Sequence, residues 1–445
     1  MAALGAFPTL AELDARTQAL VRQAAADPAS AAAAARVEVT PLGRSRSGHP
    51  ISLVSLGDGP RSALVVGAPH PNEPVGCAAI EALIDRLLAG PAAWCGHRWH
   101  FIKAIDADGL RLNEGWLKSQ RAPADYFRAF FRPAFARQPE YSFPLAAGAR
   151  TFDAPTAENL CWQRALELTR PQLQVSLHNA DVGGAFYLVS RDLPGLAAAL
   201  AAQPAAAGLT LNTVGEPFEE MPAFAPGVFG FPDTVAMAAA GGYSGGDSSA
   251  RFAATRYGTF SLVCEVPMWD DPRLRDAETP LGRSERDIAE ETGRWAADAL
   301  SALAPHDAGA LAAAARGGAA DAAEVLAALE EERGKLPAVA AAATRLAARP
   351  GAGRALSNAE AALREGLARF AVARPLALLA RLARAGGAGG AAPAPGADAA
   401  LADAEAALAA RLAEMGGLAP VPLEVLVSLQ VDAVLTTARA LADGA

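Results

Sequence analysis

The sequence predicts an α/β fold, in which a mostly parallel sheet is flanked by helices, followed by a second part that is all-helical. Strand-like and helix-like segments alternate from about residue 37 to residue 300, which is typical of sheets whose strands are joined by helices. After about residue 305 the chain becomes rich in alanine, keeps Phe370 as its only aromatic residue and shows no strand pattern. These two observations define the fold class.

A chain of 445 residues is too long for one ordinary domain, so two parts are expected. We predict an α/β domain over residues 1–304 and a helical region over 305–445, with a flexible Gly/Ala/Pro linker near 385–398. Alanine favours helix, but each small side chain buries little area. The helical region is expected to pack on the first part or on a second copy of the chain.

The elements of the α/β domain follow from their patterns and turn signals. The segment "MAALGAFPTLAELDARTQALVRQ" predicts a short amphipathic helix and lacks the features of a signal peptide. Residues 37–69 predict three strands with turns at Gly43, Gly48 and "GDGP". A helix follows over "PVGCAAIEALIDRLLAG", with Pro74 in its first turn. Next come the strand "RWHFIKAIDADGL", the helix "APTAENLCWQRALELTRP" and the strands "LQVSLHNA", "GAFYLVS" and "GTFSLVCEVP".

Composition excludes several classes of function. The net charge of −9 leaves no basic stripe to neutralise phosphates, so nucleic acid is not expected as a partner. No window approaches a membrane span, so we expect no membrane contact and a cytoplasmic location. The cysteines are scattered and lie in apolar settings, which favours buried free thiols over disulfides: Cys77, Cys95, Cys161 and Cys264.

The first candidate site lies in "SALVVGAPHPNEPVG", where an apolar strand ends at His70 and Glu73 follows between two prolines. A strand end holds an imidazole rigidly, and the stiffened turn keeps a carboxylate near it. Zinc accepts nitrogen and oxygen ligands and needs a third ligand from elsewhere, leaving one position for water. Two polar residues at this spacing also occur by chance.

His178 and Glu265 extend this candidate site. His178 ends the alternating strand "LQVSLHNA", at the edge where open α/β sheets place their sites, although a core histidine is the alternative. Glu265 lies in the otherwise apolar strand "GTFSLVCEVP", where a carboxylate is costly to bury unless it is paired or functional. Beside a metal-bound water it could take a proton as general base, and a buried ion pair is the alternative.

The motifs "HPNE", "SLHN" and "LVCEVP", in this order, resemble the zinc metallocarboxypeptidase family, which is carboxypeptidase A-like. "GRSRSGHPI" and "DADGLRLNEGW" are similar to further family segments, and the match covers roughly residues 37 to 275. The resemblance implies an eight-stranded mixed sheet and one Zn²⁺ ion held by His70, Glu73 and His178. It also implies that Glu265 is the general base, and that residues 1–304 form the catalytic domain.

The residues that bind substrate are less clearly matched. Tyr243 lies at the distance from Glu265 where the family carries a tyrosine that caps the substrate, and a surface tyrosine is the alternative. Asn113 matches the asparagine of the family loop, but the arginine beside it is replaced by Glu114. Arg132, among aromatic residues, is the best candidate for an anion clamp because guanidinium binds carboxylate in bidentate fashion. Its rivals are Arg111 and Arg251.

The function expected from these residues is zinc-dependent hydrolysis of amide bonds. The first hypothesis is a metallocarboxypeptidase that releases a C-terminal residue from a small peptide, by attack of zinc-bound water activated by Glu265. The second is a deacylase or amidohydrolase of an N-acyl amino acid or similar small amide. The third is a non-catalytic helical assembly or binding module. The C-terminal helices are a candidate surface for a homo-oligomer.

Overall fold

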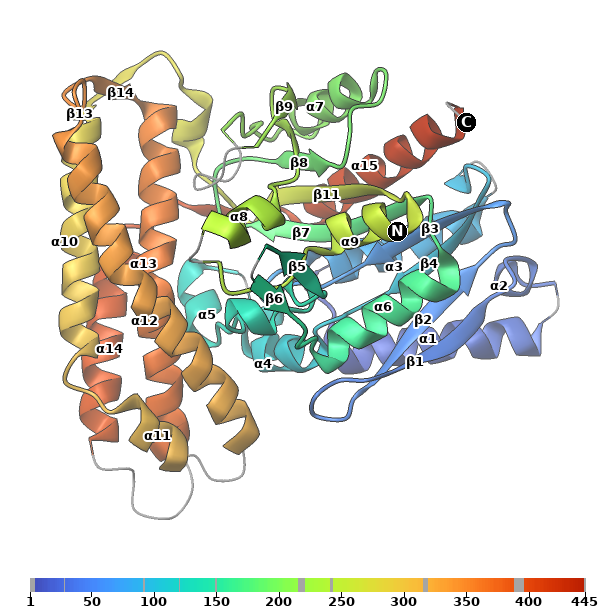
Figure 1. Cartoon of the computed structure of the whole chain (residues 1–445), viewed down its shortest axis with the longest axis horizontal. Coiled ribbons are helices and arrows are strands. Elements are labelled where there is room, and N and C mark those ends of the chain that lie inside the picture. Colours follow the sequence, from blue (N-terminus) through green and yellow to red (C-terminus); the bar gives the residue numbers. More distant parts are fainter. Residues whose placement is uncertain are drawn as a thin grey trace.

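The computed structural model contains an α/β part and a bundle of long helices beside it (Figure 1). The structure describes residues 5–27, 29–90, 93–119, 121–148, 150–214, 221–240, 243–314, 319–387 and 396–443.

A mixed sheet forms the centre of the α/β part, and it has 9 strands in the order β1-β2-β4-β3-β7-β11-β8-β10-β9 within the described ranges. The four central strands, β4-β3-β7-β11, are parallel to their neighbours in this set, and the outer pairs are mostly antiparallel. The predicted mixed α/β sheet is therefore confirmed, with one strand more than the eight implied by the resemblance. The strands are β1 (Glu38–Arg44), β2 (Pro50–Leu56), β3 (Arg61–Val66), β4 (His97–Ile102), β7 (Leu173–Ala180), β8 (Phe186–Val189), β9 (Ala223–Ala225), β10 (Val228–Gly230) and β11 (Phe260–Pro267).

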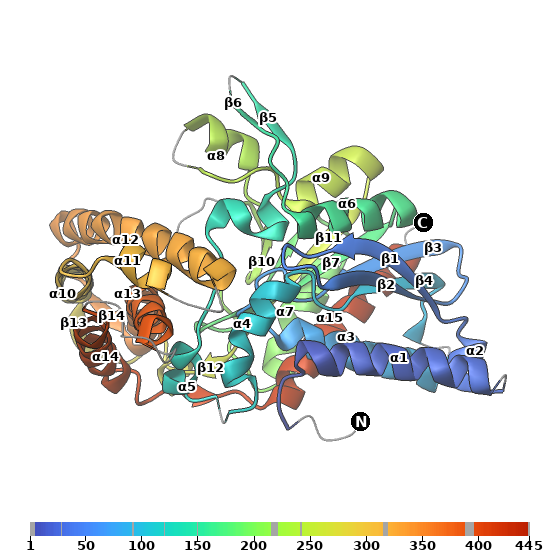
Figure 2. The same cartoon turned by 90° about the horizontal axis from the view of Figure 1, so that it is seen from below.

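Helices cover both faces of the sheet, as Figure 2 shows. The alternation of β3 explains why both faces need a cover. Ala63 and Val65 join the core on the α3 side, while Leu64 and Val66 join the second core under α6. The first face carries α1 (Leu10–Ala26), α2 (Ala31–Ala34), α3 (Val75–Ala89) and α15 (Leu423–Asp443), and the second carries α6 (Ala157–Thr169) and α9 (Ser249–Tyr257).

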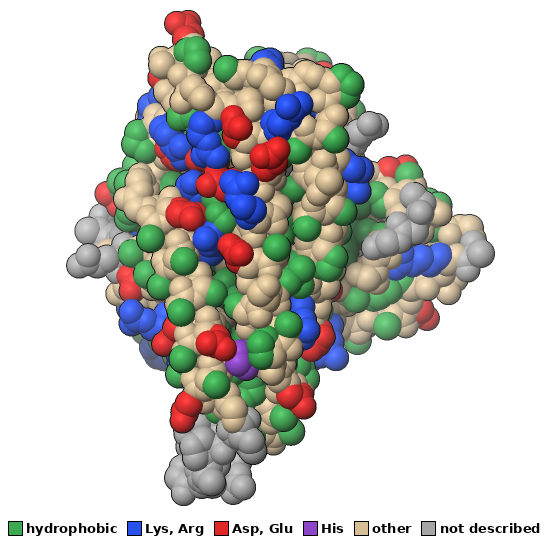
Figure 3. Space-filling view, turned by 90° about the vertical axis from the view of Figure 1, so that its left-hand side faces the viewer, with side chains coloured by type: hydrophobic (Ala, Val, Ile, Leu, Met, Phe, Trp, Pro, Cys, Tyr) green, Lys and Arg blue, Asp and Glu red, His purple; other side chains and the backbone are tan. Residues whose placement is uncertain are grey.

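The helical bundle contains five helices in the described part of the chain. Two buried glutamates hold it together with arginines: Glu285 pairs with Arg349 and Arg364, and Glu365 pairs with Arg273 and Arg283. Figure 3 shows basic and acidic side chains interspersed over the outer face of the bundle. The helices are α10 (Glu285–Leu303), α11 (Ala308–Ala314), α12 (Ala319–Ala348), α13 (Asn358–Gly387) and α14 (Ala397–Ala413). Most of the predicted linker at 385–398 lies outside the described residues.

The last helix, α15, leaves the bundle and returns to the sheet, where it packs on α3, α7 (Leu196–Ala206) and β11. Its Gln430 is fully buried and donates a hydrogen bond to the backbone carbonyl of His178 at 2.6 Å. The expectation that no segment is long and apolar enough to span a membrane was wrong, as judged by length and composition alone. α15 meets that criterion, but 56% of the relevant window is buried inside the protein, as in a core helix.

Shorter elements complete the fold. All four cysteines are free thiols, as predicted, and Cys95 is the half-buried one among them. The remaining helices are α4 (Ala107–Leu117), α5 (Pro123–Arg128), η2 (Phe135–Arg137), η3 (Pro139–Tyr141), α8 (Thr234–Ala240) and η4 (Pro272–Arg275). The small paired strands are β5 (Leu145–Ala147) with β6 (Arg150–Phe152), β12 (Trp269–Asp270) with β15 (Ala419–Pro420), and β13 (Pro280–Ser284) with β14 (Ala355–Ser357).

Candidate metal centre

The first two predicted ligands lie in the turn between β3 and α3. β3 ends at Val66 and α3 begins at Val75, so His70 and Glu73 occupy a short connection after a buried strand. Both are buried, with 2% of His70 and 5% of Glu73 exposed. The backbone N–H of Glu73 donates to the carbonyl of His70 at 3.0 Å, which closes a β-turn and fixes the two residues relative to each other.

Asn179 joins this turn to the strand that carries the second predicted histidine. Its side-chain oxygen accepts a hydrogen bond from the N–H of Val75 at 3.4 Å, and its own N–H donates to Glu73 Oε2 at 3.3 Å. Gly76 permits this close approach, because a Cβ there would lie 2.7 Å from the Cβ of Leu177. The start of α3 is therefore held directly against the end of β7.

His178 and Glu265 lie side by side at the carboxyl ends of β7 and β11, because the parallel register pairs these two residues directly. His178 Nδ1 lies 3.0 Å from Glu73 Oε2 and 3.6 Å from Glu265 Oε1. The ring centroids of His70 and His178 are 4.8 Å apart. The structure thus brings the four residues together at the carboxyl edge of the sheet, where open α/β sheets place their sites.

A further carboxylate, that of Glu140 in η3, joins the cluster, and no motif in the sequence points to it. Glu140 is 4% exposed, and its Oε2 lies 2.8 Å from His178 Nε2 and 3.7 Å from His70 Nε2. Its Oε1 accepts a hydrogen bond from Ser249 Oγ at 3.0 Å. Glu140 therefore faces the Nε2 edge of both imidazoles.

The charges of the cluster act strongly on one another. Burial disfavours each charged form, but neighbouring charges outweigh it at three of these groups. Burial raises the pKa of Glu73, but the charge of Arg132 and the hydrogen bond with His178 hold it below its usual value. His178 lowers the pKa of Glu140 to about 2, and Glu140 in turn raises the pKa of His178 well above its usual value. At His70, burial and the nearby Arg132 lower the pKa well below its usual value, so this imidazole is neutral and can act as a ligand.

The residues present fit a metal ion. Two overlapping groups have ligand atoms within 4.8 Å of one another in the described part of the chain: His70, Glu140 and His178, and Glu73, His178 and Glu265. The predicted set of two histidines and Glu73 is divided between them. Nδ1 of His70 is buried and has no hydrogen-bond partner among the described residues. An imidazole whose Nε2–H faces a carboxylate offers its Nδ1 lone pair to a metal, and nitrogen with carboxylate oxygen is a donor set that zinc accepts.

Arg132 lies against this cluster, whereas Asn113, in α4, binds backbone groups of its own helix and of the segment before Arg132. Arg132 Nη1 donates to Glu73 Oε1 at 2.6 Å, and its side chain is 22% exposed. The amide of fully buried Asn113 donates to the carbonyls of Gly109 and Phe131, and its oxygen accepts from the N–H of Phe131. Asn113 therefore fixes the backbone of the residue that precedes Arg132.

Tyr243 lies two aromatic rings away from the cluster. Tyr141 stacks on His70 with ring centroids 5.7 Å apart, and Phe135 stacks on Tyr141 at 4.6 Å. Tyr243 meets the edge of Phe135 at 5.3 Å, and its hydroxyl donates to the carbonyl of Gly246 at 2.9 Å. No sequence signal distinguished Tyr141, which lies closer to the candidate ligands than Tyr243 does.

This placement leads to a prediction for the hydroxyl of Tyr243. Because it donates to a backbone carbonyl, Tyr243→Phe should change kcat/KM by less than about threefold. The free energy of unfolding should fall by about 1 kcal/mol through loss of one hydrogen bond. Steady-state kinetics and denaturant unfolding measure the two effects. A fall of about 100-fold in kcat would instead show that the hydroxyl reaches the reacting substrate.

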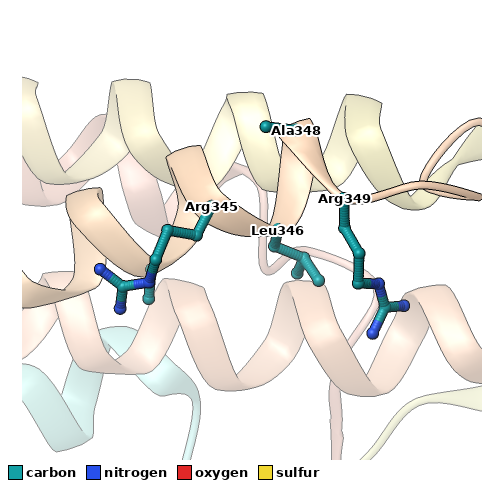
Figure 4. Close-up of a pocket in the computed structure, with 5 residues that line it drawn as sticks. Arg345, Leu346, Ala348 and Arg349 are labelled. Atoms are coloured by element: carbon teal, nitrogen blue, oxygen red, sulfur yellow. The ribbon is translucent and has the colours of Figure 1, made fainter.

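The hollow shown in Figure 4 lies on the helical bundle and contains none of these residues. Arg349, on its rim, pairs with the buried Glu285, so this arginine has a role in holding the bundle together. The hollow is lined by Ala342, Arg345, Leu346, Ala348 and Arg349. The cluster at the sheet edge, and not this hollow, is therefore the candidate site.

Comparison with known proteins gives matches among solved structures, while no family model and no curated protein matches the chain. A metallo-carboxypeptidase from Burkholderia cenocepacia is 18% identical, with a TM-score of 0.33, over 57% of this chain and 59% of that one. A metallo-carboxypeptidase from Pseudomonas aeruginosa is 18% identical, with a TM-score of 0.32, over 57% and 59%. Carboxypeptidase A from Helicoverpa armigera is 15% identical, with a TM-score of 0.37, over 59% and 65%.

The chain thus spans less than two thirds of the length of each of these proteins. These three solved proteins, to which the chain is similar, are named metallo-carboxypeptidases or carboxypeptidase A, the family that the motifs resemble.

Proposed function

We propose that the chain is a zinc-dependent hydrolase of amide bonds and acts as a metallocarboxypeptidase, releasing a C-terminal residue from a peptide. His70, Glu73 and His178 would hold one Zn²⁺ ion, and Glu265 would be the general base. The observation that carries the proposal is the Nδ1 atom of His70, which is buried without a partner among the described residues, beside a second imidazole and several carboxylates. Such a nitrogen costs free energy unless a ligand uses it.

Each residue of the cluster has a separate role in this proposal. Bound zinc supplies a Lewis acid for the scissile carbonyl and the attacking water. Glu265, 8% exposed at the end of an apolar strand, takes a proton from the attacking water and returns it to the leaving amine. Glu140 faces the Nε2 atoms of both imidazoles and keeps their protons there. Arg132 places a guanidinium next to the ligands, where its planar fork matches a substrate carboxylate.

The free C-terminus of the substrate provides the direct test. We expect an N-blocked dipeptide with a free carboxylate to be cleaved with a kcat/KM about 10²–10⁴-fold above that of its amide, because a carboxylate pairs with a guanidinium in bidentate fashion and a neutral amide does not. Mass spectrometry of the released amino acid measures this ratio. Addition of a chelator should remove activity toward the free acid. The matched variant Arg132→Met should bring the two rates closer together, since it removes the candidate clamp.

A deacylase of N-acyl amino acids or similar small amides is the second candidate, and one observation favours it. Arg132 is already bound to Glu73, and the rival clamps Arg111 and Arg251 are each paired with an aspartate. Equal cleavage of the free and amidated peptides would favour the deacylase. A protein that binds zinc but hydrolyses neither peptides nor acyl-amino acids would favour the third candidate, a non-catalytic binding module.

A further inference from the structure

The helical bundle packs against the end of the sheet at which the candidate metal centre lies (Figure 1). One close contact is between α13 and the loop that follows β7. A Cβ added at Gly183 would lie 2.6 Å from Leu363 Cδ1, and one added at Gly366 would lie 2.8 Å from Val182 Cγ2. Val182 and Gly183 follow β7, the strand that carries the predicted ligand His178. α13 is therefore in direct contact with one of the two segments that carry the site.

Arg374 of α13 extends this contact into a connected set of buried polar groups. Its Nη2 donates to Asp181 Oδ2 at 2.6 Å. Asp181 Oδ1 accepts a hydrogen bond from the hydroxyl of Tyr126 at 3.3 Å, and the same hydroxyl oxygen accepts from Asn72 Nδ2 at 3.1 Å. Tyr126 is 0% exposed and Asn72 is 2% exposed. Hydrogen bonds of this kind, away from water, hold their partners in one arrangement.

Two members of this set, Asn72 and Asp181, belong to the two segments that carry the candidate ligands, the turn between β3 and α3 and the end of β7 with the loop after it. Asn72 lies between His70 and Glu73, and Asp181 follows shortly after His178. The hydroxyl of Tyr126 therefore links these two segments through Asn72 and Asp181. Burial raises the pKa of Asp181, and the guanidinium of α13 opposes this effect, so the link depends on a charge supplied by the bundle.

We propose that Arg374 is a positioning residue of the metal centre. It acts through Asp181, Tyr126 and Asn72 to hold the turn between β3 and α3 and the end of β7 at the spacing that a metal ion requires. The inference rests on the proposed metal centre and goes beyond it, because it makes the helical bundle a part of the site. Supporting residues around metal ligands have a measurable effect on metal affinity of about 10–100-fold.

Arg374→Met in the full chain tests this role, because methionine keeps the helix propensity and the apolar stem while removing the charge. Arg381→Met is the matched control. It lies about two turns further along α13, and its Nη1 donates to the carbonyl of Ala129 at 2.9 Å, in the same interface but outside the linked set. Chelator competition measures the affinity for Zn²⁺ and Co²⁺, and the visible spectrum of bound Co²⁺ reports its geometry.

We expect Arg374→Met to weaken metal affinity about 10–100-fold and to change the Co²⁺ spectrum, while Arg381→Met keeps the wild-type affinity within about twofold. Arg374→Lys should recover part of the affinity, since lysine keeps the charge but not the fork. Equal metal affinity in the wild-type chain and Arg374→Met would overturn the inference and leave the proposed function standing.

A second variant, Tyr126→Phe, keeps the test decisive if Arg374→Met fails to fold. It removes the central hydroxyl of the linked set with almost no change in shape, and we expect it to weaken metal affinity about 10-fold. Wild-type affinity in this variant would overturn the inference. A wild-type chain that binds neither Zn²⁺ nor Co²⁺ would overturn the proposed function and, with it, the role of Arg374.

Discussion

Glu265→Gln should lower kcat about 10³-fold and leave the metal content of the protein unchanged. Glutamine has nearly the same shape, so β11 keeps its register with β7 and His178 keeps its place. The amide cannot take a proton from water, and that step then lacks its general base. Kinetics of peptide hydrolysis, together with metal analysis of the same preparation, check both halves of the prediction.

The matched control for this variant is Glu140→Gln, which changes a second buried carboxylate of the cluster in the same way. It should leave kcat of the metal-loaded enzyme within about tenfold of wild type, because its role is to position imidazoles. Loss of metal from Glu265→Gln would contradict the assignment. It would show that Glu265 is a ligand, as its place in the group with Glu73 and His178 allows.

Glu73→Gln is expected to weaken metal affinity more than 100-fold, above the range of about 10–100-fold that applies to supporting residues. An uncharged amide oxygen is a poor replacement for a carboxylate ligand. Glu140→Gln should cost only about 10-fold, because Glu140 faces the histidines and lies on the Nε2 side. Chelator competition with Zn²⁺ gives both values.

If Glu140→Gln weakens metal affinity more than Glu73→Gln does, the set of metal ligands is a different one. If Glu140→Gln loses the metal and Glu73→Gln keeps it, the ion is held by Glu140 with the two histidines, which form the other group of suitable geometry. The pairing of Glu73 with Arg132 would then be a structural ion pair. Circular dichroism should show both variants folded, since both changes are isosteric.

Much of the sheet was predictable because its strands have strong local signals. The strands before His70 and near Glu265 are mostly apolar runs, the strand near His178 alternates between apolar and polar residues, and each is found in place. The position of α15 was not predictable in this way. Helix propensity and an apolar face do not specify the surface on which a helix packs, so the pattern could not distinguish the sheet from the bundle.

The candidate site was predictable to the extent that its residues stand at strand ends. His70 and His178 share one sheet edge because parallel strands bring their carboxyl ends together. Glu140, Asp181 and Arg374 carry no such signal, since each is a charged residue in a loop or helix whose burial depends on tertiary packing. Their partners come from segments far away in the chain, and only the folded structure reveals them.

The buried amide of Gln430 has a consequence for biosynthesis. It binds the carbonyl of His178, so the central strand β7, which carries this residue of the candidate site, is covered by a helix from a distant part of the chain. During translation, the apolar surfaces of α3 and β11 that α15 covers are made before α15 and stay exposed until the ribosome has made this helix. Nascent chains should therefore depend on chaperones, and products of premature termination should aggregate.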